Sequence, residues 1–195
     1  TVSWQRCVAM LAKMPEAMRA IHPMHPAEPD ECWHLLRQSF TSVTFECVAA
    51  VRGYSRWWAQ HDMRAAYRRW ADNLRLIGMS DADRQWVLKD PSHLFAADAL
   101  LAAVPEALIV MTHRDPARSI PSVSSLNSFP RQVNDRVPND AGLGAEQQEL
   151  WARGMERMMT VRAAQPGRFL DVHFGELRAD PLGVARRILS RAGRQ

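Results

Sequence analysis

The sequence predicts an α/β protein, in which a parallel sheet with flanking helices follows an all-helical first half. Over the first eighty residues, Trp, Leu, Met and Ala recur at intervals of three and four, which is the period of helices. From residue 84 onward, short apolar runs alternate with longer helical patterns, as in β-α-β units. With 195 residues and 47% apolar content, the chain can form one core. We therefore expect a single domain over residues 1–195, made of a helical region, 1–80, and an α/β region, 84–195.

In the first half, helices are predicted over residues 3–20, 29–40 and 63–77, the last beginning at Met63 or earlier. Pro29 favours a helix start and Gly78 a helix end. The proline-containing residues 22–26 are predicted to form a connector.

The second half is predicted to alternate strands and helices. Asp115 and Pro116 supply a helix N-cap followed by proline at the first helical position. The polar residues 128–144 contain prolines, asparagines and glycines, so we expect a long loop there that acts as a lid or substrate loop. The expected strands are 86–89, 107–112 and 168–173, and the expected helices are 92–103, 116–126, 145–164 and 181–191.

Composition excludes several classes of protein. The longest apolar stretch, residues 96–111, is interrupted by charged residues and a proline, whereas a bilayer span needs roughly 20 apolar residues, so no transmembrane segment is expected. The first thirteen residues lack the apolar core of a secretory signal. Cys7, Cys32 and Cys47 are too widely spaced for a metal knuckle and are typical of reduced thiols. We expect a cytoplasmic protein.

Two further classes of ligand are not expected. His22 and His25 lie in a proline-rich segment without neighbouring ligands, which predicts no metal site. The net charge is only +4, and the arginines of residues 64–75 are interleaved with aspartates, so a solvated helix face is favoured over nucleic-acid binding.

Ligands of open α/β sheets bind at the carboxyl ends of the strands, and two predicted strand ends carry suitable residues. The first strand ends at Lys89, one of only two lysines in a chain whose other basic residues are arginine. A lysine there can neutralise a phosphate or sulfate. His93 follows at a helix start, where it is either a general base for an acceptor hydroxyl or a surface residue.

The second strand end delivers Arg114, with Ser122 eight residues later. An arginine can donate two parallel hydrogen bonds to a phosphate, and Ser122 lies about two helical turns along the following helix. The alternatives are that Arg114 pairs with a carboxylate such as Asp115 and that Ser122 is solvated.

Together these blocks resemble a known family. The pattern Trp-Val-Leu-Lys-x-Pro-x-His-Leu over residues 86–94, followed by Thr-His-Arg-Asp-Pro and then serine, is similar to that of bacterial, actinobacterial-type sulfotransferases that use 3′-phosphoadenosine 5′-phosphosulfate. Residues 169–174 and 177–182 look like a further block of that family. The resemblance covers nearly the whole chain.

The resemblance implies a sheet like that of P-loop NTPases and transfer of a sulfuryl group to a hydroxyl acceptor, which is a small molecule, a lipid or a carbohydrate. It implies that Arg114 and Ser122 bind the 3′-phosphate of this co-substrate. Lys89 would face the sulfate side and His93 would be the base. For Phe174, stacking on the adenine and packing in the core both stay open.

One element of the family pattern has no counterpart. Nothing in residues 1–79 resembles the first strand and its Gly-x-Pro-Arg-Ser-Gly-Thr-Thr loop, whose backbone N–H groups bind the 5′-phosphosulfate. No Gly-x-x-x-x-Gly-Lys-Ser/Thr loop of a nucleotide-dependent kinase occurs either. The expectation is a shortened gene product or a fragment of a longer chain, and whether this truncated chain is active stays open. The alternative function is a non-catalytic remnant that binds a nucleotide or, through its Trp-rich helical half, a protein partner.

Overall fold

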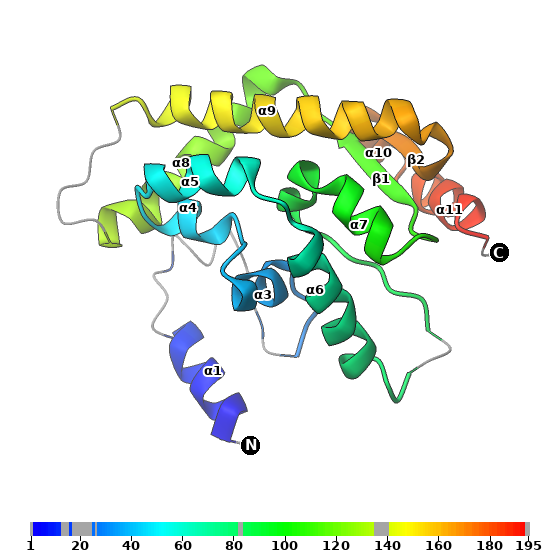
Figure 1. Cartoon of the computed structure of the whole chain (residues 1–195), viewed down its shortest axis with the longest axis horizontal. Helices are drawn as coiled ribbons and strands as arrows, with labels where there is room; N and C mark the ends of the chain where they lie inside the picture. The colour runs from blue at the N-terminus through cyan, green and yellow to red at the C-terminus, as the bar shows by residue number, and fades with distance from the viewer. Residues whose placement is uncertain are drawn as a thin grey trace.

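The structure is a computed structural model that describes residues 2–12, 16, 25, 27–81, 84–134 and 141–193 (Figure 1). Its longest helix, α9 (Leu143–Ala164), extends across the molecule from α8 (Pro116–Asn134) to the sheet. The helical half lies below α9 in this view. The predicted combination of helices with a parallel sheet is confirmed.

Two parallel strands form the sheet, β1 (Ile109–His113) and β2 (Phe169–His173). Their register pairs Ile109 with Phe169 at one end and His113 with His173 at the other. The predicted strands 107–112 and 168–173 are thus confirmed to within two residues. Because the strands are parallel and in register, their carboxyl ends lie side by side.

The predicted strand over residues 86–89 is wrong. Trp86, Val87 and Leu88 run in an extended segment that pairs with no other described strand, and their exposed fractions are 49%, 92% and 37%. The apolar pattern that favours a strand is real, but a strand also needs a neighbour to accept and donate its backbone hydrogen bonds. No described segment provides one here.

The first half is helical, as predicted, but its helices are shorter and more numerous. The predicted helix 63–77 is confirmed, and at its end the N–H of Gly78 donates to the Leu74 carbonyl at 2.8 Å. The predicted helix 29–40 begins only at Trp33, because the backbone N–H of Cys32 is held by the Lys89 carbonyl at 3.0 Å. The helices are α1 (Val2–Ala12), α3 (Trp33–Leu36), η1 (Arg37–Ser39), α4 (Thr44–Val48), α5 (Arg52–Gln60) and α6 (Arg64–Ile77).

Two predictions in the first half fall largely outside the described residues. Beyond the end of α1, only Glu16 of the predicted helix 3–20 is described. Of the predicted connector 22–26, only His25 is described.

The remaining helices of the second half are η2 (Pro91–Phe95), α7 (Ala97–Ala103), η3 (Pro166–Arg168), α10 (Phe174–Ala179) and α11 (Pro181–Arg191). The predicted helices 145–164 and 181–191 are confirmed as α9 and α11. The predicted helix 92–103 is divided at Ala96, whose φ of −147° is not helical.

The predicted loop 128–144 is wrong over residues 128–134, which belong to helix α8. The helix continues to Asn134 instead of ending near residue 126, although Pro121 and Pro130 lie inside it. Tertiary contacts support this extension: the buried Arg131 pairs with Glu46 of α4, and Asn134 donates to the Val48 carbonyl at 3.1 Å. Residues 135–140 of the predicted loop lie outside the described residues, and α9 begins at Leu143.

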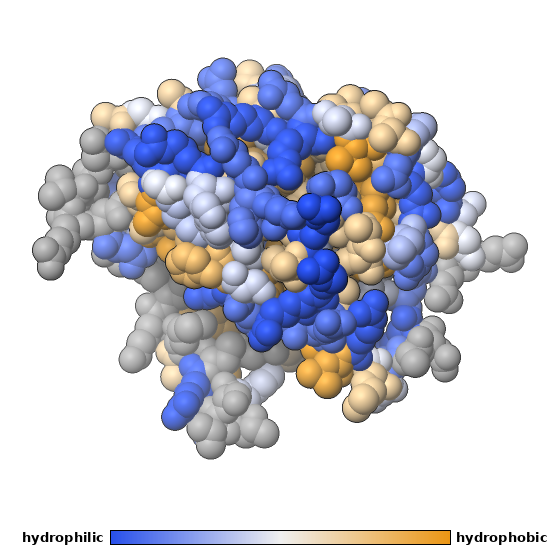
Figure 2. Space-filling view, in the orientation of Figure 1, coloured by the Kyte–Doolittle hydropathy of each residue, from blue (hydrophilic) through white to orange (hydrophobic). Residues whose placement is uncertain are grey.

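The core joins the helical half to α7, α9 and β1. Its largest fully buried side chains include Trp58, Tyr67, Trp70 and Phe95, with Trp58 and Phe95 ring centroids 4.5 Å apart. Trp58 and Trp70 therefore pack inside the protein, whereas Trp57 is 44% exposed. Figure 2 shows a mainly hydrophilic face with a hydrophobic patch at the lower end of α6, where the side chains of Leu76 and Ile77 are exposed.

Candidate functional site

The turn between β1 and α8 is built as the sequence predicts. The Asp115 carboxylate accepts from the Ala117 backbone N–H at 2.9 Å, and its carbonyl accepts from the N–H groups of Arg118 and Ser119 at 3.0 Å. Pro116 is the first residue of α8. Such a capped helix start fixes the direction in which the preceding residue, Arg114, leaves the strand.

Arg114 is exposed at this strand end, and its guanidinium carbon lies 5.0 Å from the ring centroid of Phe174. Phe174 begins α10 directly after β2, and the parallel register brings the two strand ends together. Its ring is 41% exposed, so it does not pack in the core. Ser122 is also exposed, about two turns along α8. Arg114 and Ser122 thus lie on one accessible strand–turn–helix segment.

Three hydrogen-bonded side chains that sequence reasoning missed hold this strand end in place: His113, Asp171 and Arg162. Nε2 of His113 lies 2.6 Å from Asp171 Oδ1, and Nη1 of Arg162 donates to the same oxygen at 2.7 Å. Hydrogen bonds from Arg162 and His113 lower the pKa of Asp171. The group ties β1, β2 and α9 together, so it rigidifies the residue before Arg114. An aspartate inside an otherwise apolar strand was the available signal.

Lys89 contacts a carboxylate of the helical half. Its ammonium group forms an ion pair with the carboxylate of Glu31, which lies just before α3. The Lys89 side chain remains 66% exposed, so it can change partner. A surface pair of this kind is worth little, about 0–1 kcal/mol, and is readily replaced by an anionic ligand.

His93 lies in η2 and its ring points toward α6. Nδ1 is 2.6 Å from the hydroxyl of Tyr67, and the ring packs edge-on against Trp70 with centroids 5.6 Å apart. Nε2 is inaccessible and has no hydrogen-bond partner among the residues that the structure describes. Burial lowers the pKa of His93 to about 4, so the ring is neutral at neutral pH. The structure therefore does not place His93 as an exposed surface residue.

Asp90 caps the same turn. Its Oδ1 accepts from the Ser92 backbone N–H at 2.8 Å and from the Ser92 hydroxyl at 2.6 Å. The residue is only 7% exposed, and burial raises the pKa of its carboxyl group to about 6. Oδ2 has no hydrogen-bond partner within the described part of the chain. Sequence reasoning did not single out Asp90, although its position between Lys89 and Pro91 is a helix-cap signal.

The four predicted residues fall into two groups. Arg114 and Ser122 lie at the β1–α8 segment, where Arg114 contacts Phe174. Lys89 and His93 flank Asp90 and contact the helical half, through Glu31 and Tyr67 respectively. No described contact joins the two groups directly.

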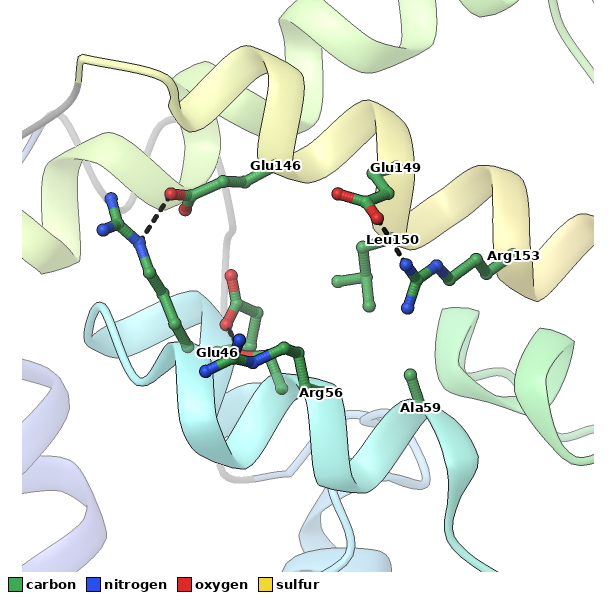
Figure 3. A pocket seen from close by; sticks show the side chains of 9 residues that line it. Glu46, Arg56, Ala59, Glu146, Glu149, Leu150 and Arg153 are labelled. Atoms are coloured by element: carbon green, nitrogen blue, oxygen red, sulfur yellow. Dashed lines mark hydrogen bonds and ion pairs between the residues drawn. The ribbon is translucent and has the colours of Figure 1, made fainter.

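A pocket of about 430 Å³ lies between α4, α5 and α9 (Figure 3). Glu46 lines it, and its walls carry the ion pairs of Arg52 with Glu146, at 2.7 Å, and of Arg153 with Glu149. Glu46 also pairs with the buried Arg131, which does not line the pocket. None of the four predicted site residues lines this pocket. Its charged walls suit a polar ligand, but the pocket is separate from the predicted chemistry.

Cys32 and Cys47 are not reactive thiols. Burial raises the pKa of Cys32 to about 11 and that of Cys47 to about 12, so both thiols stay protonated and unreactive at neutral pH. No set of three or more His, Cys, Asp or Glu side chains within the described ranges is arranged to hold a metal ion. None of the described helices is long and apolar enough to cross a bilayer.

The fold and this strand-end site define a class of protein. The family model described as "Sulfotransferase family" matches residues 2–195, so the chain belongs to the sulfotransferase family. No curated protein matches the chain. The resemblance inferred from residues 86–94 and 112–122 is confirmed.

Two solved structures show the same fold. Sulfotransferase STF1 from Mycobacterium tuberculosis H37Rv is 41% identical with a TM-score of 0.81, over 89% of this chain and 48% of that one. Sulfotransferase STF9 from Mycobacterium avium is 25% identical with a TM-score of 0.81, over 97% of this chain and 51% of that one. The chain thus spans about half the length of the solved sulfotransferases it matches.

Proposed function

We propose that this chain forms the part of a sulfotransferase that binds the 3′-phosphate of 3′-phosphoadenosine 5′-phosphosulfate and takes part in transferring its sulfuryl group to a hydroxyl acceptor. The observation that carries the proposal is the accessible guanidinium of Arg114 beside Phe174, at the carboxyl edge of a parallel sheet in a member of this family. Anionic ligands of such sheets bind at this edge.

The nucleotide end of the co-substrate is proposed to bind at the β1–α8 segment. Arg114 donates two parallel hydrogen bonds to the 3′-phosphate, for which its planar guanidinium is suited. Ser122 adds a hydroxyl from α8. The half-exposed ring of Phe174 offers an apolar face for the adenine. The His113–Asp171–Arg162 group holds the strand end rigid, so little ordering is needed on binding.

The reaction itself is an in-line transfer. The bond from sulfur to the bridging phosphate oxygen breaks as a bond from sulfur to the acceptor oxygen forms, and the hydroxyl proton passes to a base. Lys89 is proposed to neutralise the charge that develops on the bridging oxygen, and His93 to take the proton. Both roles require changes from the present contacts: Lys89 must leave Glu31, and Nε2 of His93 must become accessible.

The acceptor is proposed to be a hydroxyl compound: a small molecule, a lipid or a carbohydrate. The competing function is a non-catalytic module that binds a nucleotide or a protein partner. The exposed Trp57 and the patch at the end of α6 are what favour partner binding. The sulfotransferase and the protein-interaction module differ in whether the 3′-phosphate is recognised.

Calorimetric titration of the folded chain with adenosine 3′,5′-bisphosphate and with adenosine 5′-phosphate tests the proposal. A charge-assisted hydrogen bond contributes about 1.5–3 kcal/mol, so the bisphosphate is expected to bind at least about tenfold more tightly. Equal affinities would overturn the phosphate site. Failure of the folded chain to bind either nucleotide would favour the protein-interaction module.

A further inference from the structure

Tyr67 and His93 form a buried pair between α6 and η2. Tyr67 is 1% exposed, and its hydroxyl lies 2.6 Å from Nδ1 of His93. Trp70, one turn later on α6, packs edge-on against the same imidazole. Two side chains of one helix therefore fix the orientation of the ring. What remains to be determined is which ring nitrogen carries the proton.

The hydroxyl determines where that proton is. Burial raises the pKa of Tyr67 well above its ordinary value, so the phenol keeps its proton. A buried O–H group that donates to no acceptor is costly, and Nδ1 is the acceptor that the described contacts provide. A proton on Nε2 leaves that one buried donor without a partner among the described residues. A proton on Nδ1, donated to the phenol oxygen, would leave two buried groups unpaired: the phenol proton and the Nε2 lone pair. The favoured arrangement is Tyr67 O–H donating to Nδ1.

We infer that Tyr67 is a positioning residue that holds His93 in the neutral tautomer with its proton on Nε2. A neutral imidazole carries one ring proton, so an accepting Nδ1 requires a protonated Nε2. His93 in the resting protein then presents a hydrogen-bond donor at Nε2 instead of a lone pair. That nitrogen has no partner in the described residues, so its N–H is uncommitted.

The consequence for the reaction rests on the proposed function. Once Nε2 becomes accessible, His93 in this tautomer can donate to an oxygen of the sulfuryl group but cannot take the acceptor's proton at Nε2. To act as a base there, His93 must first move its proton to Nδ1, and the Tyr67 hydroxyl must turn to a different acceptor. The strength of the Tyr67–His93 bond thus decides whether His93 works as a hydrogen-bond donor or as a base.

Nitrogen NMR tests the tautomer without any assay of activity. In protein labelled with 15N-histidine, long-range 1H–15N correlations distinguish a protonated from an unprotonated ring nitrogen, and a His93→Gln variant identifies which signals belong to His93. At neutral pH the wild type is expected to show a protonated Nε2 and an unprotonated Nδ1. A proton on Nδ1 in the wild type would overturn the inference, whether or not the chain binds a nucleotide.

The two tyrosines of the chain provide matched variants. Tyr67→Phe removes the hydroxyl that contacts Nδ1 and is expected to shift the His93 signals toward a mixture of tautomers. Tyr54→Phe removes a hydroxyl that donates to the carbonyls of Phe40 and Ser42, so it should leave the His93 signals unchanged. Unchanged His93 signals in a folded Tyr67→Phe protein would contradict the positioning role. If that variant does not fold, the wild-type spectrum alone decides the tautomer.

Discussion

Asp90 and His93 belong to one buried turn, and burial shifts the pKa values of their side chains in opposite directions. The His93 backbone N–H donates to the Asp90 carbonyl at 3.2 Å. Burial raises the pKa of Asp90 to about 6 and lowers that of His93 to about 4. In both cases the interior favours the neutral form. The stability of this turn is therefore expected to depend on pH through both side chains.

Asp90→Asn should stabilise the protein at neutral pH. The folded-state pKa of Asp90 lies above its ordinary value of 3.8, because the folded protein favours the protonated carboxyl group. The contribution of Asp90 to the free energy of unfolding is therefore complete below pH 3.8 and is lost as the pH rises through about 6. Asparagine is an equally good N-cap, so the Ser92 contact is kept. The free energy of unfolding in urea, variant minus wild type, should be about 3 kcal/mol larger at pH 7 than at pH 3.5. A difference that does not change with pH would contradict the raised pKa.

His93→Gln should show the opposite dependence. The folded-state pKa of His93 lies below 6.5, so the wild-type residue contributes stability that is complete above pH 6.5 and is lost as the pH falls through about 4. The variant does not titrate there. Its stability deficit relative to wild type should therefore shrink by about 3 kcal/mol between pH 7 and pH 4. A deficit that stays constant over this range would mean that His93 is not buried in its neutral form.

Gly154→Ala should destabilise the packing of α9 on η2. A Cβ at this position would lie 2.8 Å from Cζ of Phe95, which is fully buried and cannot move away. Overpacking of this kind costs about 1–3 kcal/mol, only partly offset by a helix-propensity gain of about 1 kcal/mol. Thermal and urea unfolding would measure the loss.

Gly144→Ala provides the control in the same helix. A Cβ there meets nothing within 4 Å, so this variant should be neutral or up to about 1 kcal/mol more stable. If both substitutions had the same effect, the close approach of Gly154 to Phe95 would be wrong.

Arg131→Met should strongly destabilise the fold because it leaves the Glu46 carboxylate buried without its cation. Glu46 and Arg131 are 4% and 2% exposed, and Arg131 also donates to the Glu46 carbonyl at 2.9 Å. Removing one partner of such a pair costs about 3–5 kcal/mol. The double variant Glu46→Gln with Arg131→Met should lose less than the sum of the two single variants, since it leaves no unpaired charge. Additive losses would contradict a coupled pair.

The sequence predicts what local chemistry determines. The apolar runs of β1 and β2, the Asp115–Pro116 helix start and the Gly78 helix end all form within about two residues of the predicted positions. Arg114 is exposed at its strand end for the same reason, since a buried strand followed by a capped turn leaves its next residue outside.

What the sequence misses depends on partners that are distant along the chain. Tyr67 and His93 are 26 residues apart, and Glu46 and Arg131 are 85 apart, so no local pattern pairs them. Contacts with distant residues also explain why α8 continues past two prolines, since Arg131 and Asn134 bind to α4 and its C-terminal end. The same dependence on distant partners explains the unpaired residues 86–88, whose strand propensity is real but whose pairing depends on a neighbour.

The most direct test of the account is calorimetric titration with adenosine 3′,5′-bisphosphate of the wild type, Arg114→Ala and Arg75→Ala. Arg75 is a matched control, an exposed arginine of α6 paired with Asp72 and outside the proposed site. We predict that Arg114→Ala weakens binding at least about tenfold, the loss of a charge-assisted contact, while Arg75→Ala binds as the wild type does. Equal affinity of the wild type and Arg114→Ala, or an equal loss in Arg75→Ala, would contradict the claim that this strand end holds the 3′-phosphate.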